Sequence, residues 1–570
     1  MKIKHFFGLA VIAAITASCS SNNDLVNGGN GSGEVENGTA YASFKINLPT
    51  TSGTRAAGEP TFDKGDANEY KVNDATLLLF KKDATTGKYQ YNESVDLGNM
   101  EPWTSSSTEG ITTTAKLTAK ITKAEVGSNK GYYALIILNN NSKTAAKITE
   151  PTDGQTYADW SKNADNATVA NYLKHDNGFF MANAPKYVAG APETLVEIKN
   201  IYASKQEAEN STATTVYVER GLAKVSLAST SNEHVDIADG NYAGDHVDIT
   251  GWTLDVTNKK TFPVHVTDGL WADTWKTAAT TAATNGATMD RFHDTKLTEF
   301  QRVYWGLDPN YKKEFATVEA CEGEFTMAKT SDFKTGKDAK KAQYCLENTF
   351  DIAHMMQGQT TRVLFSAKYT PYGFSDGETF YKMGNSSQLW NATKVEAQIK
   401  AKAQEVLGEA DASKVTVTLA AEGNDMTKAG VHLVAAANIT YGTTALAPEK
   451  VDEINAKLGF KKATPTDAEV GLSTFASGVS YYIARVKHFN ELTPWNAGDA
   501  TYADNNINWL GRYGVLRNNW YELTVNSVSG PGYPDIPKVK PTDPDDENSQ
   551  YINVSVKILD WAKRSQDVNL

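Results

Sequence analysis

Short apolar runs separated by turn-forming residues dominate the chain. Residues 75–82, 131–141 and 361–370 are dense in aliphatic and aromatic side chains, and Gly, Asn, Asp and Ser separate such runs from their neighbours. Segments of this length and composition are typical of strands in the core of a β-sandwich. Similar runs occur at 214–229, 251–259, 479–489 and 520–530. The sequence therefore predicts an all-β protein built of sandwiches.

Helical periodicity is clear in two segments. In residues 391–410 and 448–460, apolar side chains recur every three or four residues, and Gly408 or Gly459 stands at the end of the pattern. We expect both segments to be helical insertions packed on a β domain. The length of 570 residues leaves room for more than one domain.

The first residues have the composition of a targeting segment. Lys2 and Lys4 precede the apolar stretch 6–15, which is too short for a permanent membrane helix, and small residues then lead to Cys19. This pattern resembles a bacterial lipoprotein signal, and it predicts a signal peptide over 1–18 with lipidation at Cys19. A plain secretory signal with an incidental cysteine is the alternative.

The overall charge and the motif content exclude several classes of function. A net charge of −12 and a pI near 5.4 argue against nucleic acid as a partner. The sequence lacks GxSxG, HExxH and phosphate-binding glycine motifs, and its histidines are dispersed. We expect no catalytic residue, no cofactor and no metal site. The acidic run 543–547 has no calcium-loop spacing, so we expect it to be a solvated linker.

Two sugar-directed functions stay open at this level. The paired carboxylates of a glycosidase lie far apart in a chain, so a single sequence cannot exclude them. The 11 tryptophans could form a platform that stacks on glycans, although their scatter from Trp103 to Trp561 favours a role in the sandwich cores.

Two cysteines follow Cys19. Cys321 and Cys345 could form a disulfide in an exported protein, which would close a loop of about 24 residues and stabilise the fold by about 3 kcal/mol. The sequence does not decide whether they are close enough to pair.

The two ends of the chain carry matching strand patterns. Apolar residues alternate with polar ones in 41–49 and again in 551–558, each beside chain that is rich in Gly, Ser, Asn, Pro or acidic residues. The apolar positions are Ala42, Phe44, Ile46 and Leu48 in the first strand, and Ile552, Val554, Val556 and Ile558 in the second. Leu559 and Trp561 then change the phase of the alternation, which predicts a bulge or break.

An exposed arginine follows the first pattern. Arg55 and Ala56 lie in the unpatterned stretch 50–60, of the kind that proteases cut. Cleavage there could release the first strand and open an apolar slot for another strand. The simpler interpretation is that both strands belong to the protein's own sheets and that Arg55 is a surface residue.

Several blocks of the chain resemble the fimbrillin family, the shaft subunits of type V pili of Bacteroidota, in its minor-fimbria (Mfa-like) branch. The matching blocks are the lipoprotein start at Cys19, TRA at 54–56, VYVERGLAKVSL at 216–227, GWTLDVTNK at 251–259, YCLENTF at 344–350, SYYIARVKHF at 480–489, YGVLRNNWYELTVNSVSGPGYP at 513–534 and the terminal INVSVKILDW with QDVNL. The block at 513–534 together with the tail is the most specific. The departures are Thr16, where Leu is usual, and the pair Gly221 and Leu222.

The resemblance implies two transthyretin-like β-sandwich domains with a few helical insertions and an extended C-terminal donor strand. It further implies a lipoprotein precursor exported through the periplasm to the outer membrane, and an arginine-specific protease that cuts between Arg55 and Ala56. The subunit would then polymerise head to tail, because one copy's C-terminal strand fills the groove that the first strand vacates in the next copy. Accessory tip and anchor subunits would complete the fimbria.

The sequence thus predicts a non-enzymatic shaft subunit of a surface fimbria with a role in cell adhesion and biofilm formation. A monomeric outer-membrane lipoprotein that binds glycans is the alternative. The expected segments are a signal peptide at 1–18, a propeptide with the removable strand at 19–55, an N-terminal sandwich at 56–217, a C-terminal sandwich at 218–537 and a linker with the donor strand at 538–570.

Overall fold

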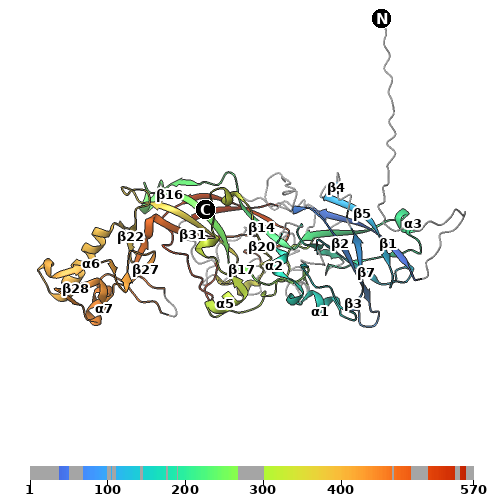
Figure 1. Cartoon of the computed structure of the whole chain (residues 1–570), viewed down its shortest axis with the longest axis horizontal. Coiled ribbons are helices and arrows are strands. Elements are labelled where there is room, and N and C mark those ends of the chain that lie inside the picture. Colours follow the sequence, from blue (N-terminus) through green and yellow to red (C-terminus); the bar gives the residue numbers. More distant parts are fainter. Residues whose placement is uncertain are drawn as a thin grey trace, which may run out of the picture.

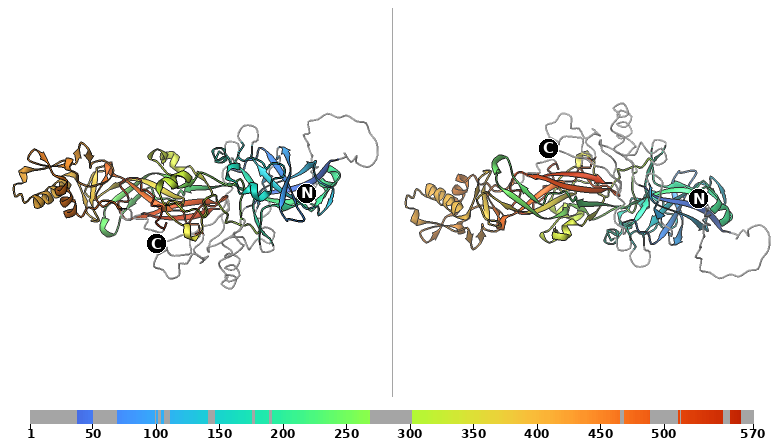
Figure 2. Two further views of the ribbon diagram at one scale, coloured as in Figure 1. Left: turned by 90° about the horizontal axis from the view of Figure 1, so that it is seen from below. Right: turned by 90° about the horizontal axis from the view of Figure 1, so that it is seen from above.

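The computed structural model is an elongated molecule (Figure 1). It describes residues 38–49, 69–98, 100, 104–105, 111–140, 146–174, 178–188, 191–267, 301–464, 468–488, 511, 513–545 and 552–559. An N-terminal β unit, a C-terminal β unit and a smaller unit with helices follow one another along the long axis, and the two further views agree (Figure 2).

One large sheet forms the N-terminal unit. Its strand order is β3 (Tyr89–Gly98), β2 (Ala75–Lys82), β7 (Tyr132–Leu138), β8 (Met181–Asn183), β13 (Thr214–Arg220), β1 (Ala40–Pro49), β5 (Ile111–Ile121) and β4 (Thr104–Ser105), with β11 (Val196–Glu197) on β7. A single core cluster contains side chains of β1 and β5 together with side chains of β2 and β7. The two halves of the sheet therefore face each other, as in a sandwich.

Two sheets form the C-terminal unit. The first has the order β20 (Gln343–Leu346), β14 (Leu222–Leu227), β32 (Trp520–Val528) and β33 (Ile552–Leu559). The second has the order β15 (His234–Asp236), β16 (His246–Asp255), β21 (Arg362–Thr370) and β31 (Val479–Arg485), with β19 (Lys334–Thr335) on β16. Their inner faces share one core that includes Trp252, Phe365 and Leu523, so this unit is a sandwich as well. The prediction of an all-β fold with few helices is confirmed.

The third unit is inserted between β21 and β31. It contains α6 (Ala392–Leu407), α7 (Pro448–Lys457), the sheet β23 (Leu389–Trp390), β22 (Phe380–Met383), β30 (Leu472–Phe475) and β27 (Gly430–His432), and the sheet β24 (Val415–Val417), β28 (Ile439–Tyr441) and β29 (Thr444–Ala445). The predicted apolar faces bury Val395, Ile399, Val451 and Ile454 in a core of their own. Gly408 ends α6 in the left-handed conformation, with φ of 64°.

Short elements complete the description. They are α1 (Tyr157–Ser161), α2 (Val169–Tyr172), α3 (Lys205–Asn210), α5 (Val318–Glu324), β6 (Gly127–Ser128), β9 (Lys186–Val188), β10 (Ala191–Glu193), β12 (Asn200–Ile201), β17 (Thr257–Asn258), β18 (Phe325–Thr326), β25 (Ala420–Ala421) and β26 (Asn424–Asp425), with short 3-10 turns between them. Among the described residues, no helix is long and apolar enough to cross a membrane.

The chain passes from the N-terminal sheet to the C-terminal sandwich at one glycine. β13 ends at Arg220 and β14 begins at Leu222, so Gly221 alone separates them. A Cβ atom at Gly221 would lie 2.1 Å from Oη of Tyr172, whose side chain is fully buried. The sequence places the domain boundary between residues 217 and 218, and the chain changes from one sheet to the other at Gly221.

Replacement of Gly221 by alanine is expected to destabilise the protein by about 1–3 kcal/mol, because the added methyl group overpacks a site that cannot relax easily. Urea unfolding measures the change. Gly323→Ala is the matched control, since a Cβ there meets no atom within 4 Å and the residue lies inside α5. Equal stability of both variants would contradict the close packing at Gly221.

The acidic linker is packed against its own domain in its first part, which corrects the expectation of a solvated spacer. Val539, Pro541 and Asp545 are buried, and Arg485 lies 2.5 Å from Oδ1 of Asp545. A buried guanidinium needs a negative partner, and the linker supplies it. The prolines of the linker do not keep the tail from folding back, because β33 returns to pair with β32.

Candidate assembly site

β1 lies in the interior of its sheet, with a partner on each edge. It pairs antiparallel with β5, from Ala40 opposite Ile121 to Leu48 opposite Thr113. On the other edge it pairs in parallel with β13, from Phe44 opposite Thr214 to Asn47 opposite Tyr217. Removal of β1 would therefore leave two unpaired strand edges.

The inner face of β1 is part of the hydrophobic core. Ala42, Phe44, Ile46 and Leu48 are each at most 1% exposed. They pack in the same cluster as side chains of β2 and β7. The strand therefore fills an apolar slot, and the prediction that these four residues share a buried face is confirmed.

The outer face of β1 is partly covered by α3. Ser43 is 4% exposed, and its hydroxyl donates to the carbonyl oxygen of Ala208 at 2.6 Å. Asn47 is 1% exposed and accepts a hydrogen bond from the hydroxyl of Thr114 at 2.7 Å. Lys45, which lies between them, is exposed. Along this face, the two buried positions therefore carry uncharged polar groups that form hydrogen bonds, and the exposed position carries a charged group.

Buried charges hold one wall of the slot in place. Glu219 of β13 accepts hydrogen bonds from Nη2 of Arg302 at 2.6 Å and from Nε at 3.0 Å, and Nδ1 of His265 lies 2.6 Å from its other oxygen. Burial raises the pKa of Glu219, but the contacts with Arg302 and His265 outweigh it, so the pKa lies below its usual value. The carboxylate is therefore ionised at neutral pH.

A second set of charges spans the junction around Gly221. Glu69, which precedes β2, lies 2.7 Å from Nζ of Lys224 in β14 and accepts a hydrogen bond from the hydroxyl of Tyr344 at 2.6 Å. Arg220 donates to the backbone oxygen of Glu69 at 2.7 Å and to Oδ1 of Asn518 at 3.1 Å. All five side chains connect the two sandwiches and fix the end of β13 relative to β14.

β33 occupies an edge, in contrast to β1. Among the strands of the described residues it pairs only with β32, from Ile552 opposite Val528 to Leu559 opposite Trp520. Ile552 is 8% exposed, and Val554 packs against the core of the C-terminal sandwich. The residues expected to form a donor strand thus lie on the protein's own sheet, in a position with one hydrogen-bonded neighbour.

The remaining predicted site residues have different outcomes. Cys19, Arg55, Ala56 and Trp561 lie outside the described residues. Cys321 and Cys345 are unbonded and belong to separate buried clusters, so the disulfide left open by the sequence is not formed.

The buried surroundings of both thiols lower their reactivity. Burial raises the pKa of Cys321 to about 11 and that of Cys345 to about 12, so both stay protonated at neutral pH. Within the described ranges, no group of three or more His, Cys, Asp or Glu residues is placed to bind a metal ion.

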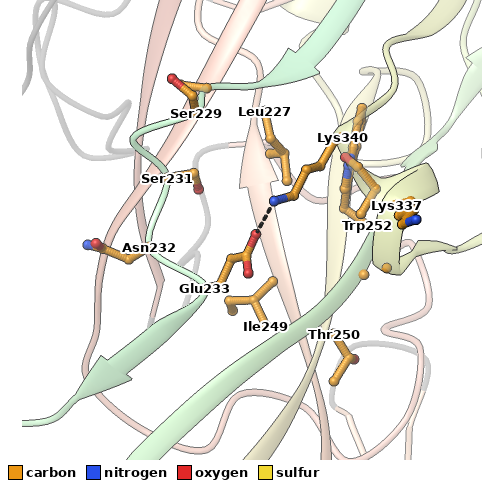
Figure 3. Close-up of a pocket in the computed structure, with 14 residues that line it drawn as sticks. Leu227, Ser229, Ser231, Asn232, Glu233, Ile249, Thr250, Trp252, Lys337 and Lys340 are labelled. Atoms are coloured by element: carbon orange, nitrogen blue, oxygen red, sulfur yellow. Dashed lines mark hydrogen bonds and ion pairs between the residues drawn. The ribbon is translucent and has the colours of Figure 1, made fainter.

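A cavity of about 650 Å³ opens at the edge of the C-terminal sandwich (Figure 3). It lies between the end of β14, β16 and the turn Gly336–Lys340, and the ion pair of Lys340 with Glu233, at 3.4 Å, crosses it. Trp252 lines it but is fully buried, and its indole N–H donates to the carbonyl oxygen of Ala339 at 2.7 Å. The ring therefore offers no open face on which a sugar could stack.

The buried charge clusters are the feature that sequence reasoning missed. Their local signal is the charged residues Glu219, Arg220 and Lys224 inside a long apolar run, since charged residues rarely occupy such positions unless they are paired. Their partners, Arg302 and Asn518, are distant in the chain, and no pattern links them.

Comparison with known proteins identifies one region. Residues 473–567 match the family described as major fimbrial subunit protein type IV, fimbrillin, C-terminal. This region contains β31, β32 and β33. Among curated proteins, none matches the chain.

Solved structures with similarity over most of the chain include a proposed cell adhesion protein from Parabacteroides distasonis, with 12% identity, a TM-score of 0.37, and coverage of 93% of this chain and 99% of that one. A fimbrilin from Porphyromonas gingivalis has 12% identity, a TM-score of 0.35, and coverage of 92% and 99%. At these identities and TM-scores the similarity supports no conclusion of its own.

Proposed function

We propose that this chain, a member of the fimbrillin family by its C-terminal region, is a structural shaft subunit of a surface fimbria with a role in adhesion and biofilm formation. The subunit polymerises head to tail after proteolysis between Arg55 and Ala56, when the C-terminal strand of one copy replaces β1 in the next. The observation that carries the proposal is that two strands in different sheets have the same apolar pattern. One is β1, a core strand near the N-terminus, and the other is β33, an edge strand in the family-matched region.

The difference between the two strand positions gives the exchange a direction. β33 has one hydrogen-bonded neighbour in its own sheet, whereas the place of β1 offers two. Each large apolar side chain that becomes fully buried contributes about 1.5–3 kcal/mol, and each additional backbone hydrogen bond contributes about 1 kcal/mol. Transfer of β33 from an edge into a vacant slot is therefore favourable, apart from the cost of association.

The proposed contact between two copies can also be repeated without limit. The slot belongs to the N-terminal sheet and the strand to the C-terminal sandwich, and these units lie end to end along the molecule (Figure 2). A head-to-tail contact between different surfaces does not close on itself and so produces a fibre. Each copy binds two others, and tip and anchor subunits terminate the polymer.

Processing depends on a single arginine. Arg55 is the first arginine of the chain, and the next, Arg220, is fully buried. Arg55 is therefore the one arginine before β13 that an arginine-specific protease could recognise. Cleavage there also separates the subunit from the lipid at Cys19, through which the precursor is held at the outer membrane.

Protease treatment of the full chain is expected to produce a ladder of oligomers on unboiled gels, and Arg55→Ala is expected to eliminate it. Lys64→Ala serves as the control, because it removes a cation from the same connection without removing the cleavage site. A ladder that forms equally well from the Arg55→Ala protein would refute the proposed trigger.

A further inference from the structure

We infer that the C-terminal strand enters the slot of the neighbouring copy in one register, in which Ser555 takes the place of Ser43 and Lys557 the place of Lys45. The strand runs in the same direction as β1. This inference rests on the proposed function and specifies how the two copies bind.

The two segments match residue by residue in this alignment. Residues 42–46 read ASFKI and residues 554–558 read VSVKI, so Ser, Lys and Ile coincide and the remaining two positions are apolar in both. An apolar pattern alone would fit any even shift, because side chains alternate with period two. The polar positions are therefore the ones that select among these shifts.

The outer face of the slot requires these polar residues at these positions. The hydroxyl of Ser43 is buried under α3, where it lies 2.8 Å from the hydroxyl of Thr118 and donates to the carbonyl oxygen of Ala208, so a substitute without a hydroxyl would lose both contacts. Ser555 supplies the same group. Position 45 is exposed and tolerates an ammonium group, which Lys557 brings to it.

The register displaced by two residues fits the outer face less well. It aligns Ile552 with Ala42 and fills all four inner positions, but it moves Lys557 to the place of Asn47, which is 1% exposed. There the ammonium would face Thr114, whose hydroxyl now donates to Asn47. Burial of an unpaired ammonium is far more costly than a change in the size of apolar side chains.

Cysteine cross-linking distinguishes the registers. Lys116 is exposed and lies directly opposite Lys45 across the β1–β5 ladder. In the preferred register it faces Lys557 of the neighbouring copy, and in the displaced register it faces Ser555. The full chain is therefore prepared with Lys116→Cys combined with either Lys557→Cys or Ser555→Cys, treated with the protease, oxidised, and run on boiled non-reducing gels.

The Lys116→Cys/Lys557→Cys protein should give a covalent ladder at least tenfold stronger than the Lys116→Cys/Ser555→Cys protein. The unsubstituted chain, whose Cys321 and Cys345 are buried, should give none. The opposite preference, or a ladder on unboiled gels without a cross-link from either pair, would overturn the register and leave the proposed function intact. Absence of any ladder from the unsubstituted chain on unboiled gels would overturn both.

Discussion

Truncation of the chain after Asn548 should abolish the protease-induced oligomers and leave a folded monomer. β33 lies at the edge of its sheet, and most of the core of the C-terminal sandwich is formed by β14, β16, β21, β31 and β32, which the truncation retains. Size-exclusion chromatography and unboiled gels measure assembly, and circular dichroism with urea unfolding measures the fold. A truncated protein that still polymerises would rule out the C-terminal strand as the connecting element.

A charge placed on the tail tests the same contact more finely. Val554→Asp puts a carboxylate on the apolar face of β33 and should reduce assembly at least tenfold, because the side chains that pack around β1 in the core are apolar. Asn553→Asp adds the same charge one residue away, on the opposite face of the strand, and should have a much smaller effect. Unfolding of the Val554→Asp monomer would show that the contact of Val554 with its own sandwich, and not a contact between copies, accounts for the loss of assembly.

Replacement of Arg302 by methionine is expected to lower the free energy of unfolding by about 3–5 kcal/mol. The substitution leaves Glu219 buried without its main cationic partner, and an uncompensated buried charge is among the costliest defects in a protein. Urea unfolding at neutral pH measures the loss. Lys205→Ala is the control, because its pair with Glu209 is at the surface and its removal should cost less than about 1 kcal/mol.

The same cluster predicts acid sensitivity. The pKa of Glu219 in the folded protein lies below its ordinary value of 4.5, so the ion pair stabilises the fold above that value and the stabilisation is lost as the pH falls below it. In the Arg302→Met protein this contribution should disappear. An identical dependence of stability on pH below 4.5 in both proteins would mean that Glu219 is not the group responsible.

Much of this fold follows from local pattern. The alternation at Ala42 to Leu48 specifies a buried face because side chains in a strand point to opposite sides, and the helices at 392–407 and 448–457 follow from spacing and terminal glycines. The partner of β33 could not be predicted in the same way. Its apolar face suits β32 of its own molecule, and equally the slot of another, since period two specifies a face and not a neighbour.

The buried charges were beyond prediction for a different reason. Glu219 and Arg302 are separated by 83 residues, and each is unremarkable in composition. Only the folded chain shows that they meet in a buried site. The prediction of a solvated acidic linker was wrong for a related reason. The sequence around Asp545 is typical of a solvated segment, but its partner, the buried Arg485, is distant in the chain.

The inserted unit enters and leaves the C-terminal sandwich at one place. Phe380 of β22 and Phe475 of β30 are opposite each other, and their rings stack in the core of the C-terminal sandwich. Tyr381 and Leu472, on the same two strands, belong instead to the separate core of the insertion. Because its two connections are side by side, this unit can be shortened, exchanged or replaced by a foreign peptide without altering the path of β1 and β33, the strands through which we propose that subunits join. The end of the molecule that carries it can thus differ in sequence and size without a change in either sandwich.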